Sequence, residues 1–425
     1  TPGSSRVIRR LPAPQQDIYA GKHTVGGRDV SKVDPTHHGL PVMPMTFNLE
    51  MMAEVGSLLV PGFVPAAICD VQLQRWLAFD ADVGLIQVSA TVLDEPAPAG
   101  EVPGSKLIKV EVRDLGSAYS PDENGFAASA GTVVMAPHYP AAPKIKSAPL
   151  ENEHPVRPTL DQVYQSLFHG PLFQGVTSLD ACGDAGINAT IRVLPRKGLL
   201  RSNDDPKFIF DPVFIDVSMH PTVGWHLEQP DQSGRILLPY EMKRIEFFGP
   251  CPEVGAEFTN RSRVAHASSR QFHQDGEIID SNGQVWCRLN GVKSWRFYLP
   301  FGEVNFHGPK DEYFLTKDWP QAMPGSTEPI PTDEEPTAFG GMNAPKDADT
   351  WCVRFTPTPD LMQAALQTAA AQVTLSRRER QVNREMKASD VERSQWLFGR
   401  VAAKDAARIL WWLRHGDRLF PADIE

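Results

Sequence analysis

The feature that most constrains the fold of this chain is a plan that occurs twice: one amphipathic helix followed by a run of strands. The first helix is expected over residues 44–60, with Pro44 in its first turn and Pro61-Gly62 at its end. Its apolar side chains recur at helical spacing: Phe47, Met51, Val55 and Leu58. Strands are expected next, over 71–79, 85–93, 107–112 and 132–135. A helix followed by antiparallel strands is an α+β unit.

The same plan recurs after a proline-rich passage at 136–158. A helical stretch over about 213–228 precedes four further strands, expected over 236–248, 257–267, 270–274 and 284–298. Asp275-Gly276 and Asn282-Gly283 are turn dipeptides, and the second is a good hairpin signal. Two such units predict an α+β double hotdog, in which two helices are each wrapped by a curved antiparallel sheet. We place the N-terminal hotdog at 1–150 and the C-terminal hotdog at 151–310.

The last quarter of the chain has a different composition. Prolines and acidic residues gather within 311–350, which predicts a linker because such a segment cannot bury enough apolar surface to fold alone. Residues 351–425 are expected to be largely helical, with an apolar stripe along 400–415. The chain has no initiator Met and ends within an expected element, so we expect it to be a piece of a longer polypeptide.

Composition narrows the classes of function. The net charge is -10 and no basic stripe carries interleaved aromatics, which argues against a nucleic-acid partner. No run of about 18 apolar residues exists, so no membrane span is expected. The cysteines are widely spaced and lack metal-ligand spacing: Cys69, Cys182, Cys251, Cys287 and Cys352. We therefore expect reduced thiols, a cytoplasmic location and no metal ion.

Two stretches about 190 residues apart carry the candidate chemistry. In the first, His23 precedes a glycine turn, and a histidine with an ordinary pKa near 6.5 offers a neutral base at cellular pH. In the second, Asp216 follows an apolar run, so burial would raise the pKa of its carboxyl and keep a proton available. His220 lies one helical turn later and could hold Asp216 in position.

Four motifs in this order resemble those of the dehydratase domains of polyketide and polyunsaturated fatty acid synthases. The histidine–glycine–proline signature of that family is split here, into His23-Thr-Val-Gly-Gly27 and Gly39-Leu-Pro-Val-Met-Pro44. Residues 167–174, Leu-Phe-His-Gly-Pro-Leu-Phe-Gln, resemble the GYxYGPxF stretch with the tyrosines replaced. Asp216-Val-Ser-Met-His220 matches the DxxxQ/H motif, and Leu238-Pro239-Tyr240 matches the LPF-type stretch.

The resemblance implies dehydration of a 3-hydroxyacyl thioester to the 2-enoyl thioester within a multidomain synthase, without a cofactor. It implies His23 as the base, Asp216 as the acid and His220 as the residue that orients it. The substrate would arrive on the phosphopantetheine arm of an acyl carrier protein, the other domains of the synthase would be partners, and a homodimer would fit the family. Residues implied in substrate contact are Gly27, Gly39, Pro44, Gly170, Pro171 and Phe173. Two other functions stay open: a product-template or cyclase-type double hotdog, and a non-catalytic scaffold.

The insertion that splits the first signature leaves the identity of the base open. His23 has the family's spacing to Gly27, and we favour it. His37 and His38 lie closer to Gly39, but at the wrong spacing. On the first helix, Glu50 and Glu54 are four residues apart, and we interpret them as a solvated face.

The end of the chain carries a second resemblance, to the middle of a phosphopantetheinyl transferase. It rests on Trp396-Leu-Phe-Gly-Arg400, the following Lys404-Asp405 and the final Asp-Ile-Glu425. It implies that Asp405 stands where that family has an acidic Mg²⁺ ligand. The family's upstream metal motif is missing, so residues 351–425 would be a partial, inactive transferase-like segment, and Mg²⁺ would be a cofactor only of a complete domain.

Overall fold

The structure is a computed structural model that describes residues 4–11, 22–79, 84–117, 122, 124–200, 203–230, 235–299, 306–318 and 350–425. The chain divides into two compact units. Unit 1 comprises 1–23 and 41–297, and unit 2 comprises 24–40 and 298–425. Both predicted hotdogs therefore contribute to one unit, and the boundary between them at residue 150 stays a prediction. Most of the predicted linker, 319–349, lies outside the described residues.

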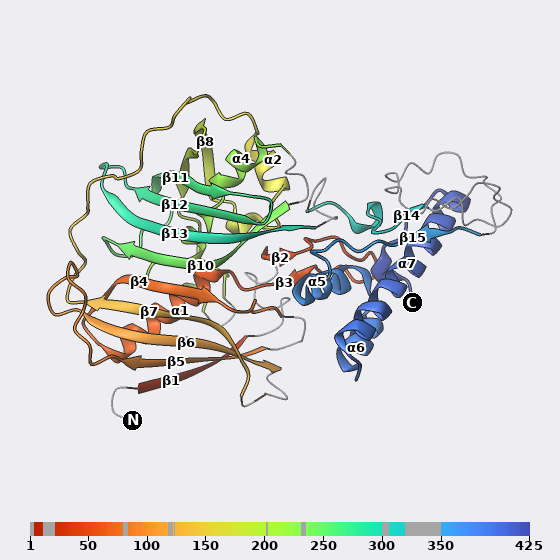
Figure 1. The fold of residues 1–425 in the computed structure, drawn as a ribbon, viewed down its shortest axis with the longest axis horizontal. Helices are drawn as coiled ribbons and strands as arrows, with labels where there is room; N and C mark the ends of the chain where they lie inside the picture. Colours follow the sequence, from red (N-terminus) through yellow and green to blue (C-terminus); the bar gives the residue numbers. More distant parts are fainter. Residues whose placement is uncertain are drawn as a thin grey trace. The chain divides into compact units, whose positions relative to one another are not determined.

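Unit 1 is built on an antiparallel sheet of eleven strands, in the order β1-β5-β6-β7-β4-β10-β13-β12-β11-β9-β8 (Figure 1). The strands from the first half of the chain are β1 (Ser4–Leu11), β4 (Val64–Leu73), β5 (Gly84–Val92), β6 (Lys106–Ser117) and β7 (Phe126–Ala136). Those from the second half are β8 (Val176–Gly183), β9 (Gly186–Arg192), β10 (Arg235–Phe247), β11 (Glu257–Ala267), β12 (Gln271–Ile279) and β13 (Val285–Tyr298). The two halves join where β4 pairs with β10, so that one sheet serves both predicted hotdogs.

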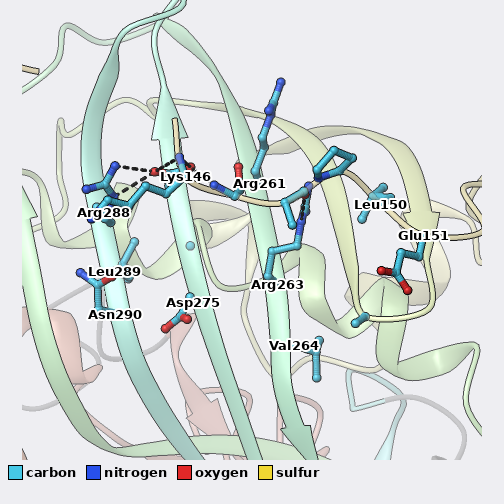
Figure 2. Close-up of a pocket in the computed structure, with 16 residues that line it drawn as sticks. Lys146, Leu150, Glu151, Arg261, Arg263, Val264, Asp275, Arg288, Leu289 and Asn290 are labelled. Atoms are coloured by element: carbon cyan, nitrogen blue, oxygen red, sulfur yellow. Dashed lines mark hydrogen bonds and ion pairs between the residues drawn. The ribbon is translucent and has the colours of Figure 1, made fainter. Parts of the chain in front are cut away.

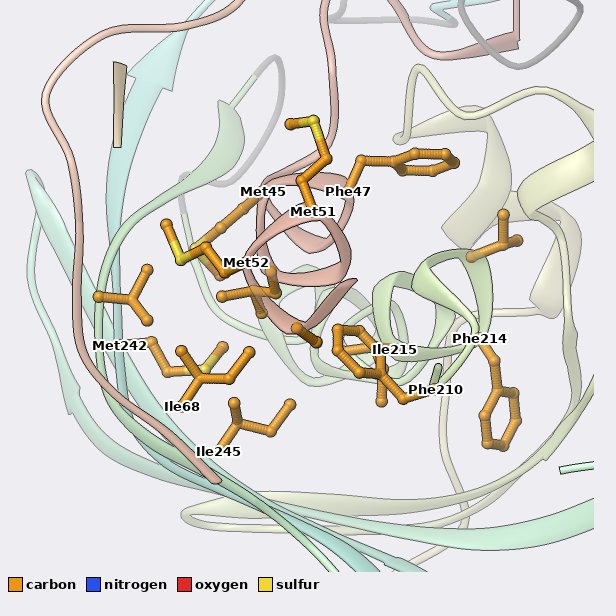
Figure 3. Close-up of a cluster of buried hydrophobic side chains, with 14 of the residues drawn as sticks. Met45, Phe47, Met51, Met52, Ile68, Phe210, Phe214, Ile215, Met242 and Ile245 are labelled. Atoms are coloured by element: carbon orange, nitrogen blue, oxygen red, sulfur yellow. The ribbon is translucent and has the colours of Figure 1, made fainter. Parts of the chain in front are cut away.

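The helices of unit 1 cover the inner face of this sheet. The first half supplies α1 (Met45–Leu59), and the second supplies α2 (Leu160–Gln165), the 3-10 turn η2 (Pro171–Phe173), α3 (Pro212–Val217) and α4 (Pro221–Leu227). Figure 3 shows α1 beside α3, with Met52 and Ile215 facing Ile68, Met242 and Ile245 of the β4–β10 join. These five side chains are fully buried. The predicted α+β arrangement, with helices against a curved antiparallel sheet, is confirmed.

Several local predictions differ from the structure. The helix expected over 213–228 is two short helices, because Pro221 begins α4 and the chain turns at 218–220. Strands β1, β8 and β9 were not predicted. Asp275-Gly276 is not a turn but an irregularity within β12, where the register against β13 shifts. The Asn282-Gly283 hairpin is confirmed, with Gly283 at φ 78° between β12 and β13.

The part of unit 2 that the structure describes forms short elements and three helices. They are η4 (Lys310–Glu312), β14 (Lys317–Asp318), β15 (Val353–Arg354), α5 (Ala364–Thr374), α6 (Arg377–Glu385), α7 (Asp390–His415) and η6 (Pro421–Asp423). The remaining strands, β2 (Thr24–Val25) and β3 (Leu40–Pro41), pair with each other. The predicted helical character of 351–425 is confirmed by α5, α6 and α7. The apolar stripe predicted along 400–415 is not the buried face of α7, which holds Lys404, Asp405 and Arg408 beside Val401 and Ile409.

Asp405, implied above as a Mg²⁺ ligand, is used inside unit 2. Its carboxylate accepts hydrogen bonds from the backbone N–H of Leu315 at 2.8 Å and of Thr316 at 3.1 Å. Arg408 Nη1 donates to the other oxygen at 2.8 Å, and both side chains are buried. In this structure the carboxylate therefore serves as an internal anchor for α7.

Two simple predictions concern the whole chain. Among the residues that the structure describes, no helix is both long and apolar enough to cross a membrane. All five cysteines are free thiols, as expected from their spacing.

A buried histidine on α4 predicts an acid-sensitive fold. Burial, together with Arg296 and Arg235, lowers the pKa of His226 to about 3 from an ordinary value of 6.5. Unfolding would restore the ordinary pKa, so between these pH values the unfolded chain binds a proton that the folded chain does not. The free energy of unfolding should therefore fall as pH falls below 6.5, by about 1.4 kcal/mol per pH unit for this group.

Urea unfolding at several pH values between 7.5 and 4.5 would measure how steeply the free energy of unfolding changes with pH. In His226→Gln, the number of protons taken up on unfolding should fall by about one, and the slope should fall in proportion. His37, whose pKa is lowered to about 4, supplies a further part of the slope that the variant keeps. An unchanged slope in the variant would contradict the assignment.

Candidate active site

His23 is held from both sides by backbone contacts within unit 1. It forms an antiparallel bridge with His169, and its carbonyl accepts a hydrogen bond from Val42 N at 3.0 Å. Its ring Nδ1 lies 2.6 Å from Val42 O. Because a carbonyl can only accept, Nδ1 carries the proton, and Nε2 is left as a lone pair. The structure thus fixes the tautomer that a general base requires.

The approach of 169–170 to His23 depends on a glycine. Gly170 N donates to Lys22 O at 2.6 Å. A Cβ at this position would lie 2.9 Å from Lys22 Cδ and 3.3 Å from Lys22 O, so a larger residue would push the two segments apart. Pro171 then begins η2, which places the Phe173 ring 5.5 Å from the His23 ring. The predicted contact residues Gly170, Pro171 and Phe173 therefore position the histidines.

Asp216 is positioned by the start of α3. Asp211 caps this helix: its Oδ1 accepts hydrogen bonds from Val213 N and Phe214 N, both at 3.1 Å. Asp211 has φ 65°, an uncommon conformation for a residue other than glycine, and Arg196 Nε donates to its Oδ2 at 2.7 Å. The capped helix and its buried apolar residues orient the Asp216 carboxylate, whose side chain is 7% exposed.

Two histidines contact the carboxylate of Asp216. His220 Nε2 lies 3.2 Å from Oδ2, as its spacing from Asp216 predicted. His169 Nε2 lies 3.3 Å from the same oxygen, although we had predicted only its neighbours in the sequence. His23 is the more distant partner: its ring centroid is 4.6 Å from that of His169. The signal for His169 was present in the sequence, since it replaces a tyrosine of the GYxYGPxF-like stretch.

The pKa of Asp216 does not follow the prediction. Burial raises it, but the hydrogen bonds that His169 and His220 donate outweigh burial and set the pKa of Asp216 below its ordinary value. Burial lowers the pKa of His23, and burial with His220 lowers the pKa of His169 to about 3. The resting site at neutral pH therefore holds neutral His23 and His169 beside a carboxylate, rather than the protonated Asp216 that we expected.

Four other candidate residues belong to unit 2. His37 belongs to unit 2, where its Nε2 lies 2.7 Å from Gln372 O and beside Arg380. Burial and Arg380 lower the pKa of His37 to about 4. His38, Gly27 and Gly39 also belong to unit 2, where Gly39 N donates to Gly27 O at 2.8 Å. The two halves of the split signature thus meet, through this bond and through the pairing of Val42 with His23.

A cavity in unit 1 joins these side chains. His23, His169, Asp216 and His220 line it, together with Pro44 and with Leu238 and Pro239 of the fourth motif. Its remaining lining is mostly apolar: Val42, Met43, Met45, Leu73, Trp76, Leu167, Phe168, Met219, Val223 and Leu237, with Thr222, Gln274 and Ser294. The cavity volume is about 80 Å³, which suits the reacting atoms of a substrate rather than a whole drug-sized ligand.

The same side chains have the chemistry of a metal-binding group. One ring nitrogen each from His23 and His169 and one carboxylate oxygen from Asp216 lie within 4.8 Å of one another. A divalent ion there would occupy both the predicted base and the predicted acid. Neutral imidazoles and a carboxylate can equally move protons, so the donor set alone does not require a metal.

Glu50 does not lie on a solvated face, and that interpretation is wrong. Its side chain is buried, and its carboxylate accepts hydrogen bonds from Ile209 N and Phe210 N, just before α3. The sequence spacing of Glu50 and Glu54 shows which face of α1 they share, but it cannot show that α3 packs against that face. Glu50 thus ties α1 to the segment that carries Asp211 and Asp216.

Replacing Glu50 with Gln should destabilise unit 1. The amide oxygen can accept one backbone N–H, but the amide nitrogen would face the other donor, so we expect a loss of about 1–3 kcal/mol in the free energy of unfolding. Urea unfolding measures it. Glu54→Gln, one turn along α1 at a half-exposed position, is the matched control and should change stability by less than about 1 kcal/mol. Equal losses in both variants would contradict the anchoring role of Glu50.

A second cavity lies on the outer side of the sheet in unit 1, over β11, β12 and β13 (Figure 2). Its volume is about 430 Å³, and it is lined by four basic side chains, Lys146, Arg261, Arg263 and Arg288, and by three acidic ones, Glu151, Asp275 and Glu277. Glu277 accepts from Lys146 N and Ser147 N and pairs with Arg288 at 2.7 Å. These bonds fasten the proline-rich passage to the sheet, so the groups serve the fold.

An antiparallel sheet wrapped around helices, with histidines and an aspartate in a small apolar cavity, is the arrangement of a double hotdog. Residues 146–297 match the family model described as the polyketide synthase dehydratase N-terminal domain. This segment therefore resembles a dehydratase domain of the polyketide synthase type. The double-hotdog fold is confirmed by the dehydratase domain of PpsC from Mycobacterium tuberculosis, solved in complex with C12:1-CoA. That structure has a TM-score of 0.50 and 17% identity, over 70% of this chain and 95% of the solved one.

Two curated relatives share sequence with the chain. One of them, from the polyunsaturated fatty acid synthase of Thraustochytrium sp., is 25% identical over 288 residues, which are 66% of this chain. The other, polyketide synthase PksM of Bacillus subtilis, is 28% identical over 93 residues, which are 21% of this chain. The chain spans only 9% and 2% of the length of these relatives. None of these matches supports the transferase-like segment at 351–425, which stays a prediction.

Proposed function

We propose that this chain dehydrates a 3-hydroxyacyl thioester to the 2-enoyl thioester as one domain of a multidomain synthase. The observation that carries the proposal is that His23, in the tautomer of a base, shares a small cavity with the Asp216 carboxylate and its two histidines. The acyl chain would arrive on the phosphopantetheine arm of an acyl carrier protein, and no cofactor is needed for water loss. A cytoplasmic location and a homodimer stay expectations of the same proposal.

In the proposed reaction, His23 Nε2 takes the proton from C2 of the substrate. The C3–O bond breaks, and the hydroxyl leaves as water with a proton from Asp216 and its histidines. A carboxylate cannot give that proton, so the active form carries one proton more than the resting site. Because Asp216, His169 and His220 are in contact, this proton belongs to the group as a whole. After product release, solvent returns the proton from His23 to the group.

The direct test is an assay with a 3-hydroxybutyryl pantetheine thioester. Formation of the crotonyl thioester, followed by its ultraviolet absorbance and by mass, supports the proposal. Ring products from a polyketide thioester would favour the cyclase-type alternative instead. A folded chain that binds the carrier protein but turns over neither substrate would favour a scaffold.

His169 gives the proposal a pH signature. His169→Phe keeps an aromatic ring beside Phe168 but removes one hydrogen-bond donor from Asp216. Loss of that donor should raise the pKa of Asp216, so the acid form persists to higher pH. The alkaline limb of the profile of kcat/KM against pH should therefore move upward by about one pH unit or more. Full profiles of both proteins measure it, and an unmoved alkaline limb would show that His169 does not act on Asp216.

A further inference from the structure

Three metal-ligating side chains meet in unit 1 away from the proposed active site. They are His154, Cys182 and Glu228, which are 28 and 46 residues apart in sequence. One ligand atom from each, an imidazole nitrogen, the thiol sulfur and a carboxylate oxygen, lies within 4.8 Å of the others. None of the three lines the cavity that holds His23 and Asp216. The fold, rather than any sequence motif, brings them together.

The backbone fixes all three positions. His154 and Cys182 form an antiparallel bridge in which each N–H donates to the other's carbonyl, both at 2.9 Å. Residues paired in this way direct their side chains to the same face. Glu228 ends α4, and its N–H donates to Trp225 O. One carboxylate oxygen of Glu228, Oε1, accepts from Arg157 N at 2.8 Å, which leaves Oε2 directed at His154.

The histidine is oriented as a metal ligand would be. His154 Nδ1 lies 2.9 Å from Asn152 O, so it carries a proton and donates. His154 Nε2 lies 2.8 Å from Glu228 Oε2. A backbone carbonyl that receives the outer ring N–H is the usual second contact of a metal-bound histidine. A metal ion bound between the side chains would replace the proton on Nε2.

We propose that His154, Cys182 and Glu228 bind one Zn²⁺ ion. Sulfur, imidazole and carboxylate are the ligands that Zn²⁺ takes in proteins, at about 2.0–2.3 Å. Such bonds require ligand atoms roughly 3.3–3.8 Å apart, so small side-chain rotations would close the site. A water molecule would complete the tetrahedron. The ion would fasten the proline-rich passage to β8 and α4, the helix that begins beside His220.

The test uses Co²⁺ in place of Zn²⁺, on the whole chain after dialysis against a chelator. A thiolate ligand gives Co²⁺ a sulfur-to-metal charge-transfer band in the near ultraviolet, which histidine and carboxylate ligands do not. We expect one Co²⁺ per chain with this band, displaced by one equivalent of Zn²⁺. Cys182→Ser should abolish the band, and His154→Asn should weaken binding by more than tenfold.

Matched controls separate this site from other thiols and histidines. Cys69→Ser, at a half-buried thiol of unit 1, and His138→Asn, at an exposed histidine, should keep the band. Circular dichroism would establish that each variant is folded. Absence of the band in the native chain, or its persistence in Cys182→Ser, would overturn the proposal. The site shares no residue with the proposed catalytic group, so its failure would leave the proposed dehydration untouched.

Discussion

Replacing Asp216 with Asn is expected to reduce kcat/KM for dehydration by about 10²–10⁴-fold, the usual contribution of a general acid. Asn keeps the size of the side chain and can still accept a hydrogen bond from His220 or His169, so the fold should be retained. It cannot carry the proton that the leaving hydroxyl requires. The crotonyl assay measures the loss, and a thermal unfolding curve compares stability.

Asp211→Asn is the matched control for this prediction. Asp211 caps the same helix but does not line the cavity, and its carboxylate pairs with Arg196 at 2.7 Å. Its replacement should lower stability, because a buried ion pair loses one partner, while the chemical step keeps Asp216. An Asp216→Asn variant with ordinary activity would refute the role of Asp216 as the acid.

Replacing His23 with Gln is expected to cause a loss of similar size, about 10²–10⁴-fold in kcat/KM. The Gln amide can donate to Val42 O as the imidazole does, but it has no basic nitrogen to take the C2 proton. Exchange of the C2 hydrogen of the 3-hydroxyacyl substrate for deuterium from solvent reports this step without the need for water loss. Both the exchange and the dehydration should fall together.

His37→Gln tests the alternative base in the same assay. His37 lies in unit 2, where its ring is hydrogen-bonded to Gln372 and Arg380. We therefore expect the activity of this variant to stay within about twofold of the native chain, which is a difference of ~0.4 kcal/mol in activation free energy. If His37→Gln were inactive and His23→Gln active, the split signature would have been aligned to the wrong histidine.

The pKa of Asp216 depends on contacts between distant segments, which the local sequence pattern does not show. Burial of the carboxyl was predicted correctly from the apolar residues around it, and burial alone does raise its pKa. The result is reversed by hydrogen bonds from His169 and His220. His169 comes 47 positions earlier and reaches Asp216 because its segment pairs with His23. Glu50 is a similar case, since its partners at 209 and 210 lie on a segment about 160 residues away.

The sequence alone was enough to predict the α+β class, the repeated plan of helix and strands, the Asn282-Gly283 hairpin and the contact of His220 with Asp216. These features depend on residues within a few positions of one another, where the helical and strand periods decide which side chains share a face. The tertiary structure alone decided the place of His169, the burial of Glu50 and the meeting of His154, Cys182 and Glu228. Each depends on packing between segments far apart in the chain, and no local period encodes which distant segment will supply the other half of a contact.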